Sequence, residues 1–345
     1  MTLNIQERHC FIRIYFKKCN PFKILYVQPV NLNELLFFLN HVYLAKGDAM
    51  QTLISKIEPL ELKRKSLFKK YLLNLLIASL LTLLIIALFV LTLKQGLYFV
   101  LFLLLVPIFF VLKALGIANE FKNTIKDELI QLALKDKFED VTYDRHGSIS
   151  QAVIDHTGLV KTPDRYSGED LIKGSYKGVT FEVSDVTLRE RHEHVDSKGN
   201  RTVSYPVYFK GRWYVYSFPK NFKGTLKVSE GNPNEARGLE KVETESIAFN
   251  KKFKMYASDK QYAFYHLTPS MMENLLTLEK EHKGRIYFYY ERNELHIGVN
   301  DSQDYLEIPF SRKINEQSML AFDRDVALIP KIIDELKLTS TKFKN

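Results

Sequence analysis

The sequence predicts an α+β protein: a two-helix transmembrane hairpin followed by a mostly antiparallel α+β cytoplasmic domain. Two observations predict this fold class. Residues 71–93 and 95–112 are uncharged runs separated only by Lys94. After Gly147 the chain alternates apolar and polar side chains, which is typical of half-buried strands.

The two uncharged runs predict transmembrane helices over 71–93 and 95–115, joined by a turn at residues 94–96. At 1.5 Å per residue the first helix is about 34 Å long, and the hydrocarbon core of a bilayer is about 30 Å thick. The alternative is a buried hairpin in a soluble protein. We do not favour it, because so long an uncharged run presents no polar face to water.

The charge distribution predicts the orientation of these spans. Residues 1–119 carry 14 Lys+Arg and 5 Asp+Glu, so the entire formal net charge of +9 lies there. Five cations lie between Lys63 and Lys70, immediately before the first span, and positive residues favour the cytoplasmic side. We therefore expect a bacterial cytoplasmic membrane protein with both termini in the cytoplasm. The remaining residues are neutral overall, which argues against a nucleic-acid partner.

Residues 1–49 form a doubtful N-terminal extension, and residues 50–70 a basic juxtamembrane segment. The codons for Lys46-Gly47-Asp48 can contain a bacterial ribosome-binding sequence just before Met50. We therefore hypothesise that translation begins at Met50. The two cysteines, Cys10 and Cys19, both precede the spans, so the later domain has no thiol for catalysis, metal binding or an internal disulfide.

An amphipathic helix is predicted over 119–138, and a soluble α+β domain over 139–345. Further helices are predicted from Thr268-Pro269 to about Glu281 and around Val326–Leu336, with Pro330 in the first turn of the latter. Hairpin turns are expected at residues 196–200 and 292–293. Strands are expected near 179–184, 203–209, 212–218, 224–229, 241–247, 261–266, 285–290, 294–299 and 304–310.

The weak catalytic candidates are Glu169, Asp170 and Asp185, an acidic group near glycines. One interpretation is a divalent-ion or general-base site. The favoured alternative is a structural turn, in which Asp170 bonds local amides while Gly168 and Gly174 adopt positive φ.

His192 and His194 are weak metal candidates, because alternate residues of a strand point to the same side. They border a predicted hairpin tip, which favours solvated residues. The spacings of phosphate loops, nucleophile elbows and common zinc sites are missing from the sequence, so we expect no cofactor.

Several blocks resemble a bacterial family catalogued as domain of unknown function 3137. They are residues 166–174 (YSGEDLIKG), 181–186 (FEVSDV), 208–211 (YFKG), 249–253, 255–261 (MYASDKQ) and 267–269 (LTP) with Met272. Together with the two preceding spans, the resemblance covers about residues 60–345. It implies an integral membrane protein of bacteria and no particular reaction.

The leading hypothesis is a non-enzymatic, membrane-anchored cytoplasmic module whose partners are the lipid bilayer and a protein. The alternatives are a membrane-bound metal-dependent hydrolase, which would use the acidic group, and a small-ligand sensor.

Overall fold

The structure is a computed structural model that describes residues 32–92, 102–135, 137–138, 140–195, 197–281 and 284–344. It is α+β, as predicted, with two apolar helices and an antiparallel sheet domain. The chain divides into two compact units, Met1–Pro59 and Leu60–Asn345. The boundary lies inside helix α1 (Leu32–Thr92), so the expected limits at residues 49 and 70 coincide with no break in secondary structure.

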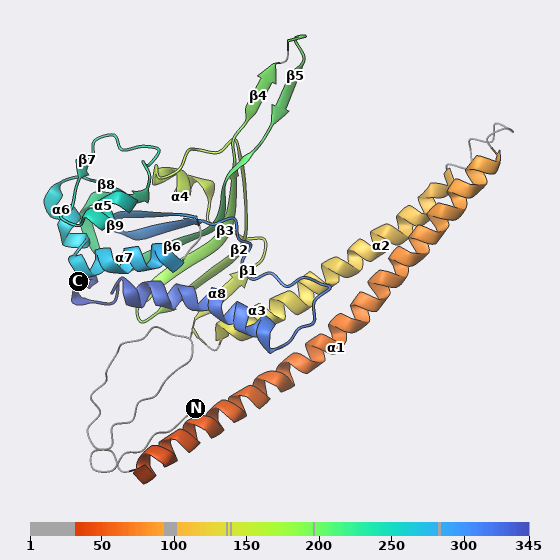
Figure 1. Ribbon diagram of the computed structural model, residues 1–345, viewed down its shortest axis with the longest axis horizontal. Helices are drawn as coiled ribbons and strands as arrows, with labels where there is room; N and C mark the ends of the chain where they lie inside the picture. The colour runs from red at the N-terminus through yellow and green to blue at the C-terminus, as the bar shows by residue number, and fades with distance from the viewer. Residues whose placement is uncertain are drawn as a thin grey trace. The chain divides into compact units, whose positions relative to one another are not determined.

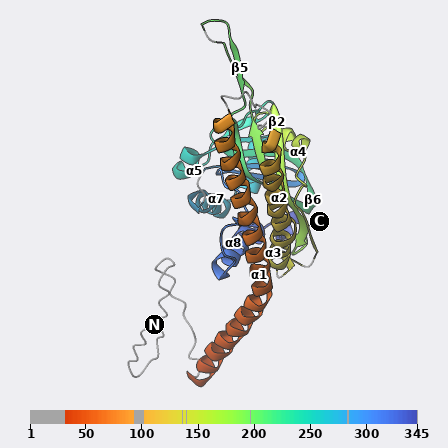
Figure 2. The same cartoon turned by 90° about the vertical axis from the view of Figure 1, so that its right-hand side faces the viewer.

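Two helices are long and apolar enough to cross a membrane, by length and composition: Ile57–Thr92 and Phe102–Lys135. Only 11% of the most apolar window of each is buried, unlike the core helix of a soluble protein. Residues 60–92 of α1 lie beside α2 (Leu105–Phe121), as Figure 2 shows. The expected turn at residues 94–96 lies outside the described residues.

Polar side chains within α1 are satisfied by the helix itself. Asn74 donates to the carbonyl of Lys70 at 2.7 Å, and Thr82 donates to the carbonyl of Ala78 at 2.8 Å. Such bonds remove the need for water or another helix, which matters in a hydrocarbon environment.

The second apolar helix continues directly into the sheet domain. After α2 the chain passes through one π-helical turn, η3 (Lys122–Lys126), into α3 (Asp127–Lys135). This confirms the predicted amphipathic helix, which ends three residues earlier than expected. Ile125 and Leu129 are fully buried, and so is Ile130.

The main sheet is antiparallel throughout, with the order β1-β2-β3-β6-β8-β7 and β9 paired to β6. Its strands are β1 (Val141–Asp144), β2 (Arg165–Tyr176), β3 (Val179–Arg189), β6 (Val207–Glu230), β7 (Glu240–Val242), β8 (Phe253–Ala257) and β9 (Arg285–Asn300).

Strand β9 folds back on itself. A Cβ built on Gly284 would lie 2.0 Å from the carbonyl oxygen of Asn300, whereas a straight strand would separate these residues by about 50 Å. The rings of Tyr289 and His296 are also neighbours, 5.6 Å apart. Arg292 has φ +53°, which fits a tight turn. The hairpin predicted at residues 292–293 is therefore confirmed.

The two halves of β6 flank this hairpin. Residues 212–217 pair with 294–299, and residues 225–229 pair with 287–291. The connection between the halves therefore passes over the hairpin tip. The expected strands at 212–218 and 224–229 are confirmed as these two halves.

Other predictions were wrong. Residues 261–266 form α6 (Lys260–His266), because the Asp259 side chain caps it by accepting from the Tyr262 amide at 2.7 Å. Only residues 241–242 of the strand expected at 241–247 are extended, at the end of β7 (Glu240–Val242), since Ser246 caps α5 (Ile247–Lys252). Residues 304–310 are irregular, and Leu306 has φ +55°.

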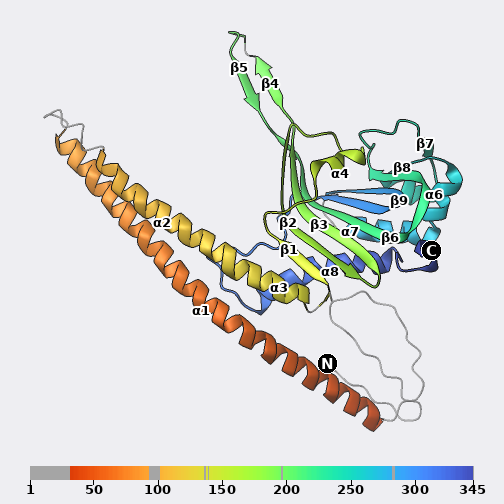
Figure 3. The same ribbon diagram turned by 180° about the vertical axis from the view of Figure 1, so that it is seen from behind.

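Helices cover both faces of the sheet (Figures 1 and 3). On one face α4 (Gln151–His156) lies over a core that includes Trp213. On the other lie α7 (Pro269–Glu281) and α8 (Glu316–Glu335). Pro330 lies in the interior of α8, not in its first turn as expected. A proline there costs roughly 3 kcal/mol, which burial of Val326, Ile329 and Ile333 offsets.

Strands β4 (His192–Val195) and β5 (Arg201–Ser204) form a separate two-stranded sheet, and the described residues 197–200 of the expected turn lie between them. Every residue of the two strands is exposed. We call residues 192–204 the arm.

An aromatic cluster surrounds His266, which is 1% exposed. Phe222, Tyr262, Tyr290 and Phe343 contact its ring, Phe343 coming from the C-terminal η4 (Thr341–Phe343). Neither ring nitrogen has a hydrogen-bond partner among the described residues. Burial, and then the charges of Lys342 and Lys220, lowers the pKa of His266 to about 3.

This histidine should make stability depend on pH. Between about pH 6.5 and 3 the unfolded chain binds a proton at His266 that the folded chain does not. Its contribution is therefore fully present above pH 6.5 and falls by up to about 1.4 kcal/mol per pH unit below it. Denaturant unfolding of the detergent-solubilised chain from pH 7.5 to 5 should show the loss. In the His266→Phe variant this component should disappear, and an unchanged slope would contradict the assignment.

Candidate functional site

Two predicted site residues, Glu169 and Asp170, lie at an irregularity in β2. The register with β3 passes from Glu169 opposite Asp185 to Ile172 opposite Val183, so β2 contains an extra residue there. Asp170 itself has φ +59°, a conformation that aspartate tolerates better than most residues. The expected positive φ at Gly168 and Gly174 was wrong.

Gly168 and Gly174 are needed because neighbouring atoms leave no room for a side chain at either position. A Cβ on Gly168 would lie 2.6 Å from the Ser148 side chain, and one on Gly174 would lie 2.7 Å from the carbonyl oxygen of Asp140. Glu169 and Asp170 thus lie on a bulged strand that Ser148 approaches closely at Gly168 and the Asp140 carbonyl approaches closely at Gly174.

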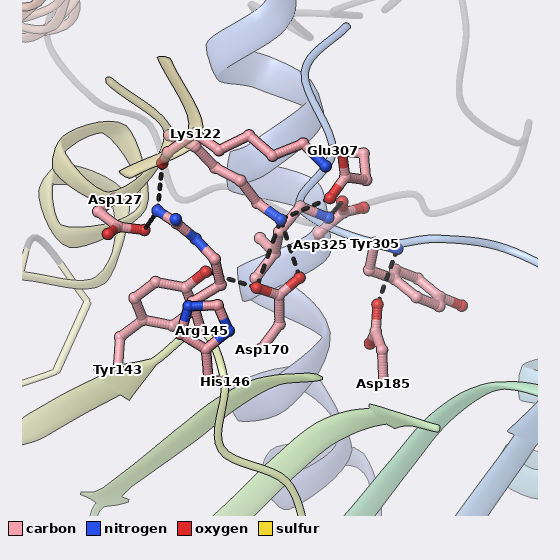
Figure 4. A network of polar contacts seen from close by, with 12 residues as sticks. Lys122, Asp127, Tyr143, Arg145, His146, Asp170, Asp185, Tyr305, Glu307 and Asp325 are labelled. Carbon is pink, nitrogen blue, oxygen red and sulfur yellow. Dashed lines mark hydrogen bonds and ion pairs between the residues drawn. The ribbon is translucent and has the colours of Figure 1, made fainter. Parts of the chain in front are cut away.

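Asp170 is buried and bonded to side chains, not to local amides as expected. The Lys126 ammonium lies 3.1 Å from one of its carboxylate oxygens, and the Tyr143 hydroxyl donates to the other (Figure 4). Burial, and then the charge of Asp170, raises the pKa of Tyr143, which keeps the phenol protonated as a donor. Lys126, at the last position of the π-turn, also contacts Glu307.

Asp185 forms a second buried ion pair. One oxygen accepts from Arg212 Nε at 2.7 Å, and the other accepts from the Tyr305 amide at 3.0 Å. The Arg212 side chain is fully buried, lies 4.1 Å from the centre of the Tyr305 ring and donates to the carbonyl of Asp325. Burial raises the pKa of Asp185, and the Arg212 charge and the two hydrogen bonds oppose that shift.

One irregular segment forms hydrogen bonds to both ion pairs, Lys126–Asp170 and Asp185–Arg212. Residues 301–314, which we call the strap, bring the Tyr305 amide to Asp185, the Leu306 amide to Asp325 at 3.0 Å and Glu307 to Lys126 (Figure 4). These bonds explain why the segment is not a strand. The Tyr305 and Leu306 amides donate to carboxylates on β3 and α8, so they cannot donate to a neighbouring strand of a sheet.

The strap also reaches the apolar helices. The Phe310 ring lies 5.3 Å from Phe68 and 5.4 Å from Tyr71, both on α1, and 4.5 Å from Phe121 on α2. We call these four rings the aromatic junction. The contact therefore links both apolar helices to the segment that closes the buried ion pairs.

A buried ion pair holds the strap to α1. Arg64 donates to the Glu61 carboxylate at 2.8 Å and to the carbonyl of Phe310 at 2.9 Å. Glu61 in turn accepts from the Ile314 amide at 2.8 Å. Both side chains are less than 10% exposed, so this is a packed contact and not a surface encounter.

Glu169 has a different environment. It lines a cavity of about 170 Å³ with Asp185, Lys210, Gly211 and the strap residue Asp304. Desolvation in the cavity wall, and then the nearby charge of Asp170, raises the pKa of Glu169. Two of the three acidic candidates therefore meet at one cavity, while Asp170 is occupied by Lys126.

His192 and His194 lie on the exposed arm, opposite Ser204 and Thr202. His192 is 3.7 Å from Glu190. No group of three or more His, Cys, Asp or Glu side chains that could hold a metal ion occurs among the described residues.

The sequence did not indicate Lys126, Tyr305, Glu307 or Asp325 as part of this site. They come from η3, the strap and α8, and only tertiary contacts bring them together. Arg212 did carry a signal, because it alternates with Tyr214 and Tyr216 on one face of a strand that is otherwise apolar there.

Asp170→Asn tests the buried pair. Asparagine keeps the backbone conformation and removes the charge, so Lys126 loses its buried partner. We expect a loss of roughly 3–5 kcal/mol in the free energy of unfolding, measured by denaturant titration. The double variant Lys126→Met/Asp170→Asn should recover part of that loss, because no buried charge is left unpaired and Glu307, which also loses Lys126, is 39% exposed to water.

The matched control is Glu182→Gln, which breaks the exposed pair between Lys173 and Glu182. An exposed pair contributes about 0–1 kcal/mol, so this variant should stay close to wild type. If Asp170→Asn is no more destabilising than Glu182→Gln, the buried pair is not a structural support.

Comparison with known proteins identifies part of the chain. Residues 207–338 match a family model described as a protein of unknown function, DUF3137. This range includes the blocks at 208–211 and 249–272, whereas those at 166–174 and 181–186 precede it. No curated protein matches the chain.

A solved structure similar to the chain is the crystal structure of the mycobacterial trehalose monomycolate transport factor A, TtfA. The identity is 10%, the TM-score is 0.31, and the alignment covers 61% of this chain and 94% of that one. A likeness at this level carries no argument about function. The family match agrees with the resemblance found in the sequence over residues 207–338, where this chain is similar to the DUF3137 family.

Proposed function

We propose that this chain is a membrane-anchored interaction module of a bacterial cytoplasmic membrane, with its sheet domain and both termini in the cytoplasm. The observation that carries the proposal is the strap. It packs against two helices with exposed apolar surfaces at one end and closes the buried ion pairs of the sheet domain at the other.

The apolar surface supports the membrane part of the proposal. Large aliphatic and aromatic side chains are exposed along both helices, and water would disfavour so continuous a surface. They include Leu72, Leu76, Leu80, Leu83, Leu84, Leu91, Phe102, Leu105, Phe109, Leu112 and Leu115. The cations from Lys63 to Lys70 support the cytoplasmic orientation.

The use of the acidic residues supports an interaction module over a hydrolase. Both oxygens of Asp185 and both oxygens of Asp170 already accept hydrogen bonds from the protein. A general base or metal ligand needs a free lone pair directed at its substrate or ion. Of the three acidic candidates, only Glu169 lines the cavity without a hydrogen bond to its carboxylate among the described residues, and that observation favours a small-ligand sensor as the second candidate.

The arm supports a protein partner. It carries the exposed aliphatic residues Val195 and Val203, and isolated two-stranded hairpins are marginally stable in water. Pairing with a strand of another protein would satisfy the outer edges of β4 and β5.

Cysteine labelling tests the orientation. In a variant with Cys10 and Cys19 replaced by Ser, Lys198→Cys places one thiol at the arm tip. A membrane-impermeant maleimide should label it in inside-out vesicles and not in intact spheroplasts, because the arm faces the cytoplasm.

Gln95→Cys, in the segment between the spans, is the matched control and should label in the reverse pattern. Equal labelling of Lys198→Cys from outside would overturn the orientation. Release of the full chain by alkaline carbonate would overturn the anchor itself.

A further inference from the structure

Exposed cations lie close in sequence to the aromatic residues at which the strap meets the apolar helices. Lys63, Lys65, Lys69 and Lys70 on α1 are all exposed, whereas Arg64 between them is buried and paired with Glu61. None of the four exposed lysines has a carboxylate within 4 Å among the described residues. In this part of α1, Arg64 therefore has a structural role, whereas the four exposed lysines have no carboxylate partner among the described residues.

The rest of the chain adds cations at the same place. Lys113 and Lys122 are exposed on and just beyond α2, and Arg312 and Lys313 are exposed in the strap. These four also lack a carboxylate partner within the described part of the chain. We call the eight residues the basic collar: Lys63, Lys65, Lys69, Lys70, Lys113, Lys122, Arg312 and Lys313.

Acidic residues do not neutralise the collar. Within residues 60–71, 105–122 and 308–314, all described, the acids are Glu61 and Glu120. Glu61 is buried, forms an ion pair with Arg64 and accepts a hydrogen bond from the Ile314 amide. Glu120 therefore stands against eight exposed cations without a carboxylate partner, so this surface attracts anions.

The aromatic junction places the collar at the edge of the apolar surface. Lys69 and Lys70 lie three and two residues before Leu72, which is exposed, and Lys113 lies between the exposed Leu112 and Leu115. Aromatic rings concentrate at membrane interfaces, and lysine side chains extend from there to the headgroups. The collar is therefore at the level where lipid phosphates lie.

We propose that the collar is a binding site for the phosphate groups of anionic phospholipids, and that the strap contributes to it through Arg312 and Lys313. The inference rests on the proposed membrane anchor and deepens it. Because the same strap closes the pairs at Lys126 and Asp185, anionic lipid bound at its cations stabilises the fold of the sheet domain.

The strap cations allow lipid binding to be separated from membrane orientation. Lysines on α1 flank the first span and act on topology. Arg312 and Lys313 follow the second span by nearly 200 residues, beyond the range in which charges orient a span. Neutralising them removes collar charge without changing insertion.

The experiment uses the full chain in nanodiscs, with thermal unfolding as the readout. Wild type should melt at a higher temperature in phosphatidylcholine discs that contain phosphatidylglycerol than in discs of phosphatidylcholine alone. A cation near a membrane surface contributes about 1 kcal/mol, or roughly fivefold in affinity. Arg312→Gln/Lys313→Gln removes two such cations, which together correspond to roughly 30-fold in affinity, so half-maximal stabilisation should move to a much higher phosphatidylglycerol fraction or not be reached.

The matched control is Arg237→Gln/Lys260→Gln, which removes the same charge from exposed residues of the sheet domain outside the collar. It should respond like wild type, and both double variants should melt like wild type in phosphatidylcholine alone. Inorganic phosphate added to phosphatidylcholine discs should give no stabilisation.

Three results would overturn the inference: no effect of phosphatidylglycerol on wild type, an equal loss of response in both double variants, or equal stabilisation by inorganic phosphate. Each can occur in a chain that remains in the bilayer, so each is distinguishable from failure of the membrane anchor, which carbonate extraction reports.

Discussion

The buried contact between Lys126 and Asp170 is the interaction on which the connection between the apolar helices and the sheet depends. An ammonium group removed from water is very costly unless a carboxylate lies beside it. Lys126 belongs to the helix that continues from α2, and Asp170 belongs to the sheet. If the two separate, Asp170 keeps only the Tyr143 hydroxyl as a side-chain donor and Lys126 keeps only the partly exposed Glu307 as a carboxylate partner.

The strap contacts both buried ion pairs and both apolar helices. It supplies Glu307 to Lys126 and the Tyr305 amide to Asp185, and its Phe310 ring packs between the two apolar helices. A displacement of the helices relative to each other would act on Phe310 first and on the buried pairs next. The sheet holds the site residues in place, because the two halves of β6 pair with both sides of the β9 hairpin and helices pack on both faces of the sheet.

Local chemistry was sufficient for much of the fold. The apolar runs, the alternation in β3 and β6 and the turns at residues 196–200 and 292–293 follow from short stretches of sequence. The errors have two origins, one local and one long-range. Residues 261–266 suit a strand or a helix, and the Asp259 cap selects the helix. Residues 304–310 have strand-like composition, yet their amides bond carboxylates that are distant in the sequence.

The sequence by itself determined that this protein has two helices apolar enough for a bilayer, an antiparallel α+β domain and an uneven charge beside the helices, because each depends on residues close together in the chain. Only the tertiary structure decided that Asp170 and Asp185 hold ion pairs, that Lys126 and Arg212 are their partners and that residues 301–314 connect them to Phe68 and Phe121. The physical reason is that burial assigns these roles. A charged residue has the same appearance in a sequence whether it lies in water or beside a counterion in the interior. Its environment is made by residues far away in the chain: 181 positions separate Lys126 from Glu307, and 253 separate Glu61 from Ile314.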